Sequence, residues 1–286
     1  MERSETAQYA AAHRAYHLMK HSPAILEDTA ALWLLAPPLG PVLRFPPLRW
    51  LFWRPLINKV GPISTFIVVR SRFAEDALAE AIQTGCRQYV MLGAGLDSWA
   101  LRHTKEGVTA FELDHPATQA YKAERILARL GKMPPHLILI PIDFESRSVA
   151  DVLPDGGLDT TSVAFVSWLG TIPYLTRDAI AATLTSLAEV CAPGSRLALD
   201  YFLPRTTMSP DDEALFDLLD RGGTERGEPM RSLLDVAEMA GMLTASGFRV
   251  LEDLSAADIH HRYLAGREDG LAVPGFVRLC LAERES

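Results

Sequence analysis

The sequence has few of the features that mark secreted, membrane-spanning or nucleic-acid-binding proteins. Its three cysteines, Cys86, Cys191 and Cys280, lie far apart and lack the spacing of a metal site. We therefore expect no metal, and we expect buried thiols in a reducing compartment. The net charge is −8 and no basic run occurs, which argues against nucleic acid as a partner because phosphate binding needs clustered lysine and arginine.

Long apolar segments are also missing. The longest, residues 30–43, is interrupted by Pro37, Pro38 and Pro41 well short of a membrane span. The first residues carry acids and no apolar core, so no signal peptide is expected and the expected location is the cytoplasm. With 286 residues, of which 48% are apolar, the chain fits one large α/β domain with additions, or at most two domains.

The strongest indication of function lies in residues 89–98. Four apolar residues followed by Gly93, Ala94 and Gly95 predict a buried parallel strand that ends in a tight turn, where the backbone approaches a ligand closely. The next predicted strand ends in Asp114 about twenty residues later, at the spacing from which a carboxylate reaches the ribose hydroxyls of a bound nucleoside. A nucleoside-containing cofactor is therefore expected here.

Two cofactor classes fit this turn. A dinucleotide site prefers a third glycine where Ser98 stands, and the carboxylate of Asp97 would repel a pyrophosphate. The same carboxylate suits an ammonium or sulfonium centre, which favours S-adenosyl-L-methionine over a nicotinamide dinucleotide. An ordinary strand-to-helix turn without a ligand is the third interpretation.

Strands and helices alternate along most of the chain, which predicts a parallel sheet with right-handed crossovers. Ligands of such sheets bind beyond the carboxyl ends of the strands. The residues that end or follow predicted strands are therefore expected to converge on one crevice. They are Gly93, Asp114, Asp143, Trp168 and Tyr201. The predicted strands are residues 89–92, 108–114, 137–144, 162–168, 196–202, 248–251 and 276–282, of which the last two should be antiparallel.

Helices are predicted at residues 6–19, 25–35, 70–84 and 116–130, after Thr176 and after Ser232. Arg70 would then stand at a helix N-terminus, where the dipole disfavours a cation. It either serves a ligand carboxylate or is a solvated surface arginine.

Two segments fit neither strand nor long helix. Residues 37–55 interleave tryptophan, phenylalanine and arginine with prolines. They fit a wall of the substrate pocket, plain packing against the domain, or a membrane-surface patch. Residues 203–230 are polar and acidic and are expected to close over the substrate.

Three motifs taken together resemble the leucine carboxyl methyltransferase family of class I S-adenosylmethionine-dependent methyltransferases, in its bacterial O-methyltransferase branch. They are Leu-Gly-Ala-Gly-Leu-Asp at residues 92–97, Phe-Glu-Leu-Asp-His-Pro at 111–116 and Pro-Ile-Asp-Phe at 141–144. The resemblance covers nearly the whole chain. It implies an α/β, Rossmann-like class I methyltransferase fold, with a seven-stranded, mostly parallel sheet whose last strand is antiparallel. It also implies a helical N-terminal cap at residues 1–69, a methyltransferase domain at 70–286 and a lid insertion at about 203–230.

The resemblance also implies roles for single residues. Gly93, with Ala94 and Gly95, would approach the cofactor by its backbone, and Asp114 would accept from the ribose hydroxyls. The remaining cofactor contacts would be Asp143 and Phe144 at the adenine and Arg70 at the methionine carboxylate. The chain departs from the family at Leu169, where members often carry glutamate.

The expected reaction is methylation of a carboxylate or hydroxyl on a small organic acid or polyketide-like acceptor. A carboxylate acceptor needs a cation, for which Arg205, Arg231 and Arg262 are candidates. A hydroxyl acceptor needs a base, for which His260 or His261 are candidates.

The aromatic rings of Trp168, Tyr174 and Tyr201 would flank the sulfonium and the acceptor, with plain core packing as the alternative for each. Trp168 is counted with the cofactor-binding residues, and Tyr174, Tyr201 and His260 are the candidate catalytic residues. Competing hypotheses are a nicotinamide-dependent oxidoreductase and a cofactor-binding protein without turnover. A homodimer is one possible assembly.

Overall fold

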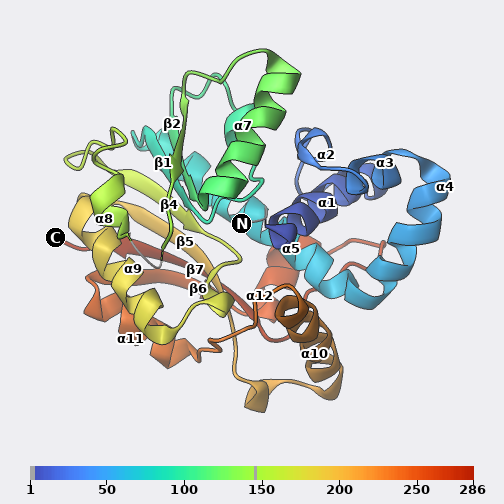
Figure 1. The fold of residues 1–286 in the computed structure, drawn as a ribbon. Helices are drawn as coiled ribbons and strands as arrows, with labels where there is room; N and C mark the ends of the chain where they lie inside the picture. The colour runs from blue at the N-terminus through green and yellow to red at the C-terminus, as the bar shows by residue number, and fades with distance from the viewer. Residues whose placement is uncertain (1–3, 145–146) are drawn as a thin grey trace.

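The computed structural model describes residues 4–144 and 147–286. Its centre is a seven-stranded sheet in the order β3-β2-β1-β4-β5-β7-β6 (Figure 1). Strands β1 to β5 are parallel, and β7 pairs antiparallel with both β5 and β6. The strands are β1 (Gln88–Leu92), β2 (Thr109–Asp114), β3 (Leu137–Pro141), β4 (Ala164–Trp168), β5 (Arg196–Phe202), β6 (Phe248–Leu254) and β7 (Val277–Arg284).

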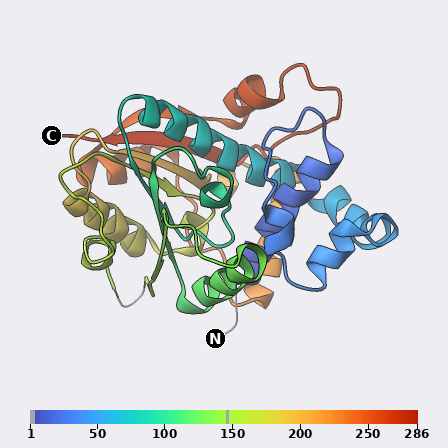
Figure 2. The same ribbon diagram turned by 90° about the horizontal axis from the view of Figure 1, so that it is seen from above.

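The central strands β1 and β4 are buried at every residue, as a parallel sheet with helices on both faces requires. Alternate residues of β1 belong to two cores. Tyr89 and Met91 pack on the face covered by α5 (Arg54–Gln83) and α7 (Pro116–Leu130). Val90 and Leu92 pack with α8 (Val149–Val152), α9 (Arg177–Val190) and α11 (Val236–Ala245) on the other. Figure 2 shows α5 and α9 on opposite sides of the sheet.

The N-terminal region forms a helical cap beside the sheet (Figure 1). It begins with α1 (Glu5–Lys20), whose first turn is capped by the Ser4 side chain accepting from the Ala7 amide. Then come α2 (Ala31–Leu34), α3 (Leu39–Arg44), α4 (Pro46–Leu48) and the π-helical turn η1 (Arg49–Trp53). The prolines keep these helices short because a proline inside a helix removes a hydrogen bond and clashes with the preceding turn.

Helix α5 corrects the prediction that a helix begins at Arg70. It runs from Arg54 to Gln83 and bends at Val60, whose φ and ψ are −119° and 19°, two residues before Pro62. Arg70 therefore lies well inside the helix, too far from its N-terminus for the positive end of the helix dipole to disfavour the cation. The proposed boundary between residues 69 and 70 also falls within α5.

Two further helices differ from prediction. The helix expected at 25–35 is reduced to Ala31–Leu34, because the Asp28 side chain accepts from the amides of Ala30 and Ala31 and starts the helix there. The helix expected after Ser232 begins at Val236, capped by Asp235. The Ser232 hydroxyl instead donates to the carbonyl of Leu175.

The segment 203–230 is helical where no regular element was predicted. It contains the 3-10 turn η3 (Arg205–Thr207) and α10 (Pro210–Glu225). The short elements that complete the fold are α6 (Trp99–Arg102), η2 (Ile172–Tyr174), α12 (Ala256–Ile259) and the π-helical turn η4 (His260–Leu264). Within residues 4–144 and 147–286, none of the helices combines the length and the apolar character that crossing a bilayer requires.

Candidate cofactor and acceptor site

A cavity of about 600 Å³ lies beyond the carboxyl ends of β1, β2 and β4. Its walls come from the turn after β1, from Asp114, from Ser167 of β4 and residues 169–171 after that strand, and from α1. This is the edge of a parallel sheet at which α/β proteins bind their ligands. The volume falls within the range of about 300–1,000 Å³ for small-molecule sites.

The glycine turn after β1 leaves no room for side chains. Gly93 and Gly95 have φ of 64° and 53°, in the left-handed region that favours glycine. A Cβ on Gly93 would stand 2.6 Å from Thr171 Oγ1, and one on Gly95 would stand 3.0 Å from the Cβ of Ala7. The turn therefore presents bare backbone to the cavity.

Asp114, at the end of β2, holds this turn. Its Oδ2 accepts from the Gly95 amide at 2.6 Å, and its Oδ1 accepts from the His115 amide at 2.7 Å. Burial raises the pKa of the Asp114 carboxyl, and these two amide hydrogen bonds oppose the rise. The Thr118 side chain also hydrogen-bonds this carboxyl. One ligand hydroxyl can therefore take the remaining lone pair, and a second can replace Thr118 as a donor.

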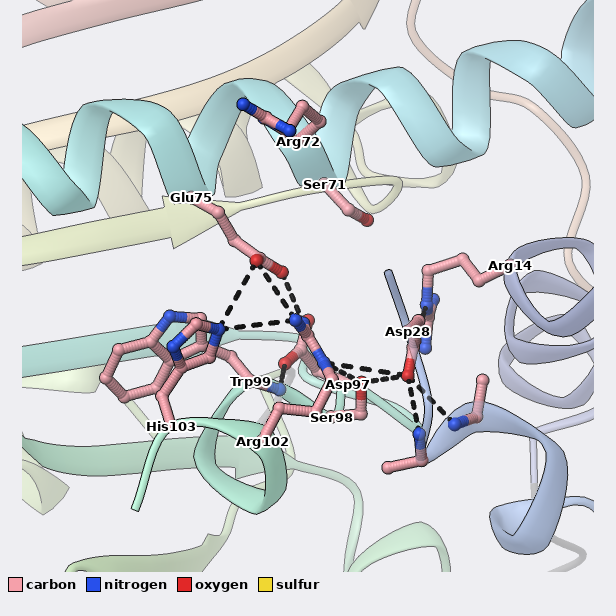
Figure 3. Close-up of polar contacts among 12 residues, drawn as sticks. Arg14, Asp28, Ser71, Arg72, Glu75, Asp97, Ser98, Trp99, Arg102 and His103 are labelled. Atoms are coloured by element: carbon pink, nitrogen blue, oxygen red, sulfur yellow. Dashed lines mark hydrogen bonds and ion pairs between the residues drawn. The ribbon is translucent and has the colours of Figure 1, made fainter. Parts of the chain in front are cut away.

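A buried ion-pair network joins the turn to the N-terminal cap (Figure 3). Arg14 of α1 donates from Nε to Asp28 Oδ2 at 2.8 Å and from Nη2 to the Leu96 carbonyl at 2.6 Å. The Ser98 hydroxyl donates to Asp28 Oδ1 at 2.6 Å. Burial alone would raise the pKa of Asp28, but Arg14 and the nearby Arg102 outweigh it and lower the pKa. Asp28 is therefore ionised and ties α1 to the turn.

The network continues to α5 through Arg102. Its guanidinium contacts Glu75, and its Nε donates to Ser98 Oγ at 3.1 Å. His103 stacks on Trp99, with ring centroids 5.0 Å apart, and its Nε2 lies 3.7 Å from Glu75 Oε2 (Figure 3). The glycine turn is thus braced from both the cap and α5 before any ligand binds, which favours tight positioning of a ligand.

Arg70 and Asp200 form a second buried pair at the cavity wall. Arg70 Nη1 lies 3.3 Å from Asp200 Oδ2, and Asp200 Oδ1 accepts from the Gly170 amide at 2.5 Å. Burial raises the pKa of Asp200, while Arg70 opposes that rise. Arg70 passes so close to Gly170 that a Cβ there would stand 2.6 Å from Arg70 Cζ.

The family of the protein follows from the part of the chain that builds this cavity. The model of the leucine carboxyl methyltransferase family matches residues 7–188, a range that contains Arg70, the glycine turn and Asp114. The chain belongs to the leucine carboxyl methyltransferase family. The family predicted from the sequence is thereby confirmed.

Relatives with methyltransferase names support this. YktD of Bacillus subtilis is 29% identical over 95% of this chain and 94% of that protein. ML2020 of Mycobacterium leprae is 34% identical over 68% of this chain and 62% of that protein. Both are named as S-adenosyl-L-methionine-dependent methyltransferases, which agrees with the cofactor expected from the sequence.

Solved structures confirm the predicted fold. A protein from Thermobifida fusca named as a methyltransferase has a TM-score of 0.62 at 14% identity, over 97% of this chain and 94% of that one. A protein of the DUF574 family from Streptomyces avermitilis has a TM-score of 0.59 at 15% identity, over 95% and 96% of the two chains.

The cavity of this methyltransferase gathers most of the residues proposed from the sequence. Those that line it are Arg70, Gly93, Ala94, Gly95, Asp114, Phe144 and Tyr174. Asp143 is exposed beside it, and its proposed contact with adenine stays a prediction. Leu169, the departure from the family pattern, lines the cavity as well.

Trp168 and Tyr201 do not reach the cavity. Both are buried in the core on the opposite face of the sheet, and the Tyr201 hydroxyl donates to Asp253 Oδ2 at 2.6 Å. Successive side chains of a strand point to opposite faces. The neighbour Ser167 lines the cavity, and the neighbour Asp200 pairs with Arg70 in the cavity wall. The residues chosen from the sequence were therefore one position away.

His260 and the arginines proposed for the acceptor also lie elsewhere. His260 is exposed on η4. Arg205 pairs with Asp217, and Arg262 pairs with Glu252. Arg231 is exposed and lines a neighbouring cavity that shares Tyr174 and Glu228 with this one, so its proposed role stays a prediction. Residues 37–55 contribute nothing to the cavity wall either, so the interpretation as a pocket wall is wrong for that segment.

Arg226 and Glu228 are cavity residues that were not predicted from the sequence. Both follow α10 and line the cavity. Arg226 lies over the ring of Tyr9, with 5.6 Å between Cζ and the ring centroid, and Glu228 contacts the Thr6 hydroxyl. The signal for this place in the sequence is the Arg-Gly-Glu-Pro stretch at residues 226–229, whose glycine and proline indicate a turn. The described residues hold no cluster of ligands that could bind a metal ion.

Proposed function

We propose that this methyltransferase transfers a methyl group from S-adenosyl-L-methionine to a carboxylate oxygen of a small organic acid. The observation that carries the proposal is which of the three cavity arginines already has a carboxylate partner. Arg14 and Arg70 are already paired with Asp28 and Asp200. No carboxylate of the described residues forms an ion pair with Arg226, which leaves its charge available for an anionic acceptor.

The residues around the glycine turn fit the cofactor. Asp114 would accept from the ribose hydroxyls, Phe144 would cover the adenine, and Arg70 would meet the methionine carboxylate. Gly93 and Gly95 leave the backbone bare where the cofactor must pass. When bound, the cofactor supplies a methyl group activated by a sulfonium centre. The protein itself contributes alignment and a site shielded from water.

A carboxylate acceptor fits the protonation states of the groups that line the cavity. It is ionised at neutral pH, so its methylation requires a cation and no base. Burial raises the pKa of Tyr174, so its phenol stays protonated near neutral pH. Tyr174 can therefore donate a hydrogen bond to the acceptor but is a poor proton acceptor.

A hydroxyl acceptor is the second candidate, and Glu228 is the observation that favours it. Its carboxylate lines the cavity next to Thr6 and is the group that would take the proton. The two candidates differ in their products, which are a methyl ester and a methyl ether.

The test uses S-adenosyl-L-methionine with a tritiated methyl group and a panel of carboxylic acids, each matched with the corresponding alcohol or phenol. Mild alkali releases volatile methanol from an ester and leaves an ether intact. We expect alkali-labile product from the acids alone. Alkali-stable product would favour the hydroxyl reaction, and cofactor binding without product from any acceptor would favour a binding protein without turnover.

The role of Arg226 is tested by Arg226→Gln, with Arg221→Gln as the matched control because Arg221 is an exposed arginine on α10. Losing one charge-assisted hydrogen bond should raise KM for the acid about tenfold or more and leave KM for the cofactor unchanged. An equal effect of both substitutions would remove Arg226 from the acceptor site.

A further inference from the structure

The most exposed apolar side chains of the protein lie together at one corner of the cap. We call residues 44–54 the aromatic corner. Within it Phe45, Trp50, Leu51 and Phe52 are 56%, 65%, 55% and 59% exposed. No other large apolar side chain of the described residues exceeds 48%. Figure 1 shows α4 at the edge of the cap farthest from the strands, so the corner projects away from the body of the protein.

The aromatic corner is anchored in this projecting position. Trp53 is 2% exposed, and its ring lies 5.2 Å from His13 and 6.2 Å from Tyr16 of α1. Arg49 Nη1 donates to the carbonyl of Leu43, whose side chain is fully buried. The outward aromatic side chains therefore belong to a folded turn that is held on α1, and their exposure is part of the fold.

Positive charge surrounds the aromatic corner. Residues 29–74 contain no aspartate or glutamate, although the whole chain has a net charge of −8. Arg44 and Arg54 are exposed at the two ends of the corner, Arg49 is half-buried between them, and Lys59 is exposed one turn further on. The corner thus combines exposed aromatic and cationic side chains and faces no carboxylate of its own segment.

We infer that the aromatic corner docks this protein reversibly on an anionic bilayer surface. Tryptophan and phenylalanine settle at the boundary between lipid headgroups and acyl chains, and neighbouring arginines pair with the lipid phosphates. The surface of the bilayer supplies the negative charge that the corner lacks. No spanning helix is needed, because the contact consists of side chains on the face of a folded turn.

A second copy of the chain fits this surface less well. Homodimers usually form by a twofold contact that places the same patch against itself. Such a contact would set Arg44 and Arg54 of one copy against those of the other, in a segment with no acidic residue to offset them. Like charges in close contact oppose association.

The test measures co-sedimentation with vesicles of phosphatidylcholine alone and of phosphatidylcholine mixed with phosphatidylglycerol. We expect binding to the mixed vesicles only, and weaker binding as salt is added. Arg44→Gln/Arg54→Gln should weaken binding about fivefold for each arginine removed. Trp50→Ser/Phe52→Ser should weaken it at least about tenfold.

The matched control is Leu127→Ser/Leu130→Ser on α7, where the two side chains are 47% and 48% exposed. It should bind vesicles like the unchanged protein. All variants should keep their affinity for S-adenosylhomocysteine, which verifies that they are folded.

Three results would overturn the inference. The first is absence of binding to the anionic vesicles. The second is equal binding by the Trp50→Ser/Phe52→Ser variant. The third is a dimer in light scattering that this variant abolishes, because the corner would then bind a second copy of the chain.

Discussion

Gly170→Ala probes the most crowded point of the cofactor site. Gly170 has φ of 68°, and a Cβ there would stand 2.6 Å from Arg70 Cζ, with the guanidinium nitrogens at similar or shorter range. The Arg70 side chain can swing away, but it then leaves Asp200, which is fully buried. The substitution therefore converts a steric conflict into a broken ion pair.

The expected cost has two parts. An alanine in the left-handed region costs about 1–2 kcal/mol. Leaving the buried Asp200 without its cation costs about 3 kcal/mol more, the lower end of the range for a broken buried pair. The free energy of unfolding should fall by about 4–5 kcal/mol in total. Affinity for S-adenosylhomocysteine should fall as well, since Arg70 would no longer point into the cavity.

Urea unfolding and calorimetric titration with S-adenosylhomocysteine measure the two effects. Gly107→Ala is the control, because Gly107 has φ of 66° and nothing within 4 Å of its built Cβ. Gly107→Ala should therefore show only the cost of placing an alanine in the left-handed region. If Gly170→Ala unfolds with the same free energy as Gly107→Ala and binds the ligand normally, the Arg70–Asp200 pair does not hold the site as described.

Three further predictions concern groups outside the reaction itself. Burial lowers the pKa of His13 from 6.5 to about 4. The stability contributed by the neutral imidazole is therefore fully present above pH 6.5, and about 3 kcal/mol of it is lost as the pH falls toward 4. In urea unfolding across this range, the stability of His13→Gln should depend less on pH than that of the unchanged protein, and an equal pH dependence would contradict the prediction. Tyr201→Phe should lower the free energy of unfolding by about 1–2 kcal/mol and leave kcat unchanged. Asp253 Oδ2 then loses its hydroxyl donor, while Arg278 still donates to Oδ1. A large loss of kcat would return Tyr201 to the catalytic residues. Asp28→Asn should lower the free energy of unfolding by about 3 kcal/mol or more, because it leaves the buried charge of Arg14 without a carboxylate. A free energy of unfolding in urea within about 0.5 kcal/mol of the unchanged protein's would refute that.

The parallel sheet and the glycine turn could be predicted because each depends on local sequence. Apolar runs of strand length alternate with helical segments, and Gly93 and Gly95 mark the sharp bend after β1. The spacing to Asp114 follows from the length of one strand-to-strand crossover. These local signals also sufficed for the family resemblance.

The orientation of side chains at strand ends was harder to predict. A strand buried on both faces shows no alternation of polar and apolar residues, so the sequence does not reveal which residue faces the cavity. Tyr201 and Trp168 were chosen for their chemistry, whereas the structure brings Asp200 and Ser167 to that side. Asp200 is recognised only through Arg70, 130 positions away along the chain.

The network around the glycine turn also depends on distant residues. Asp28 lies 70 positions before Ser98 in the sequence, and no periodic pattern links them. The position of Arg226 likewise depends on how α10 returns the chain to the cavity. Such pairings arise from the tertiary fold, and a single sequence carries no local signal for them.

Calorimetric titration of the protein and of Asp114→Ala with S-adenosylhomocysteine measures whether the glycine turn and Asp114 together hold the adenosyl ligand. Removing two charge-assisted hydrogen bonds should weaken the Kd at least about 100-fold, while Asp155→Ala, at an exposed loop carboxylate, should leave it unchanged. A Kd for Asp114→Ala within about threefold of the unchanged protein's would contradict the account.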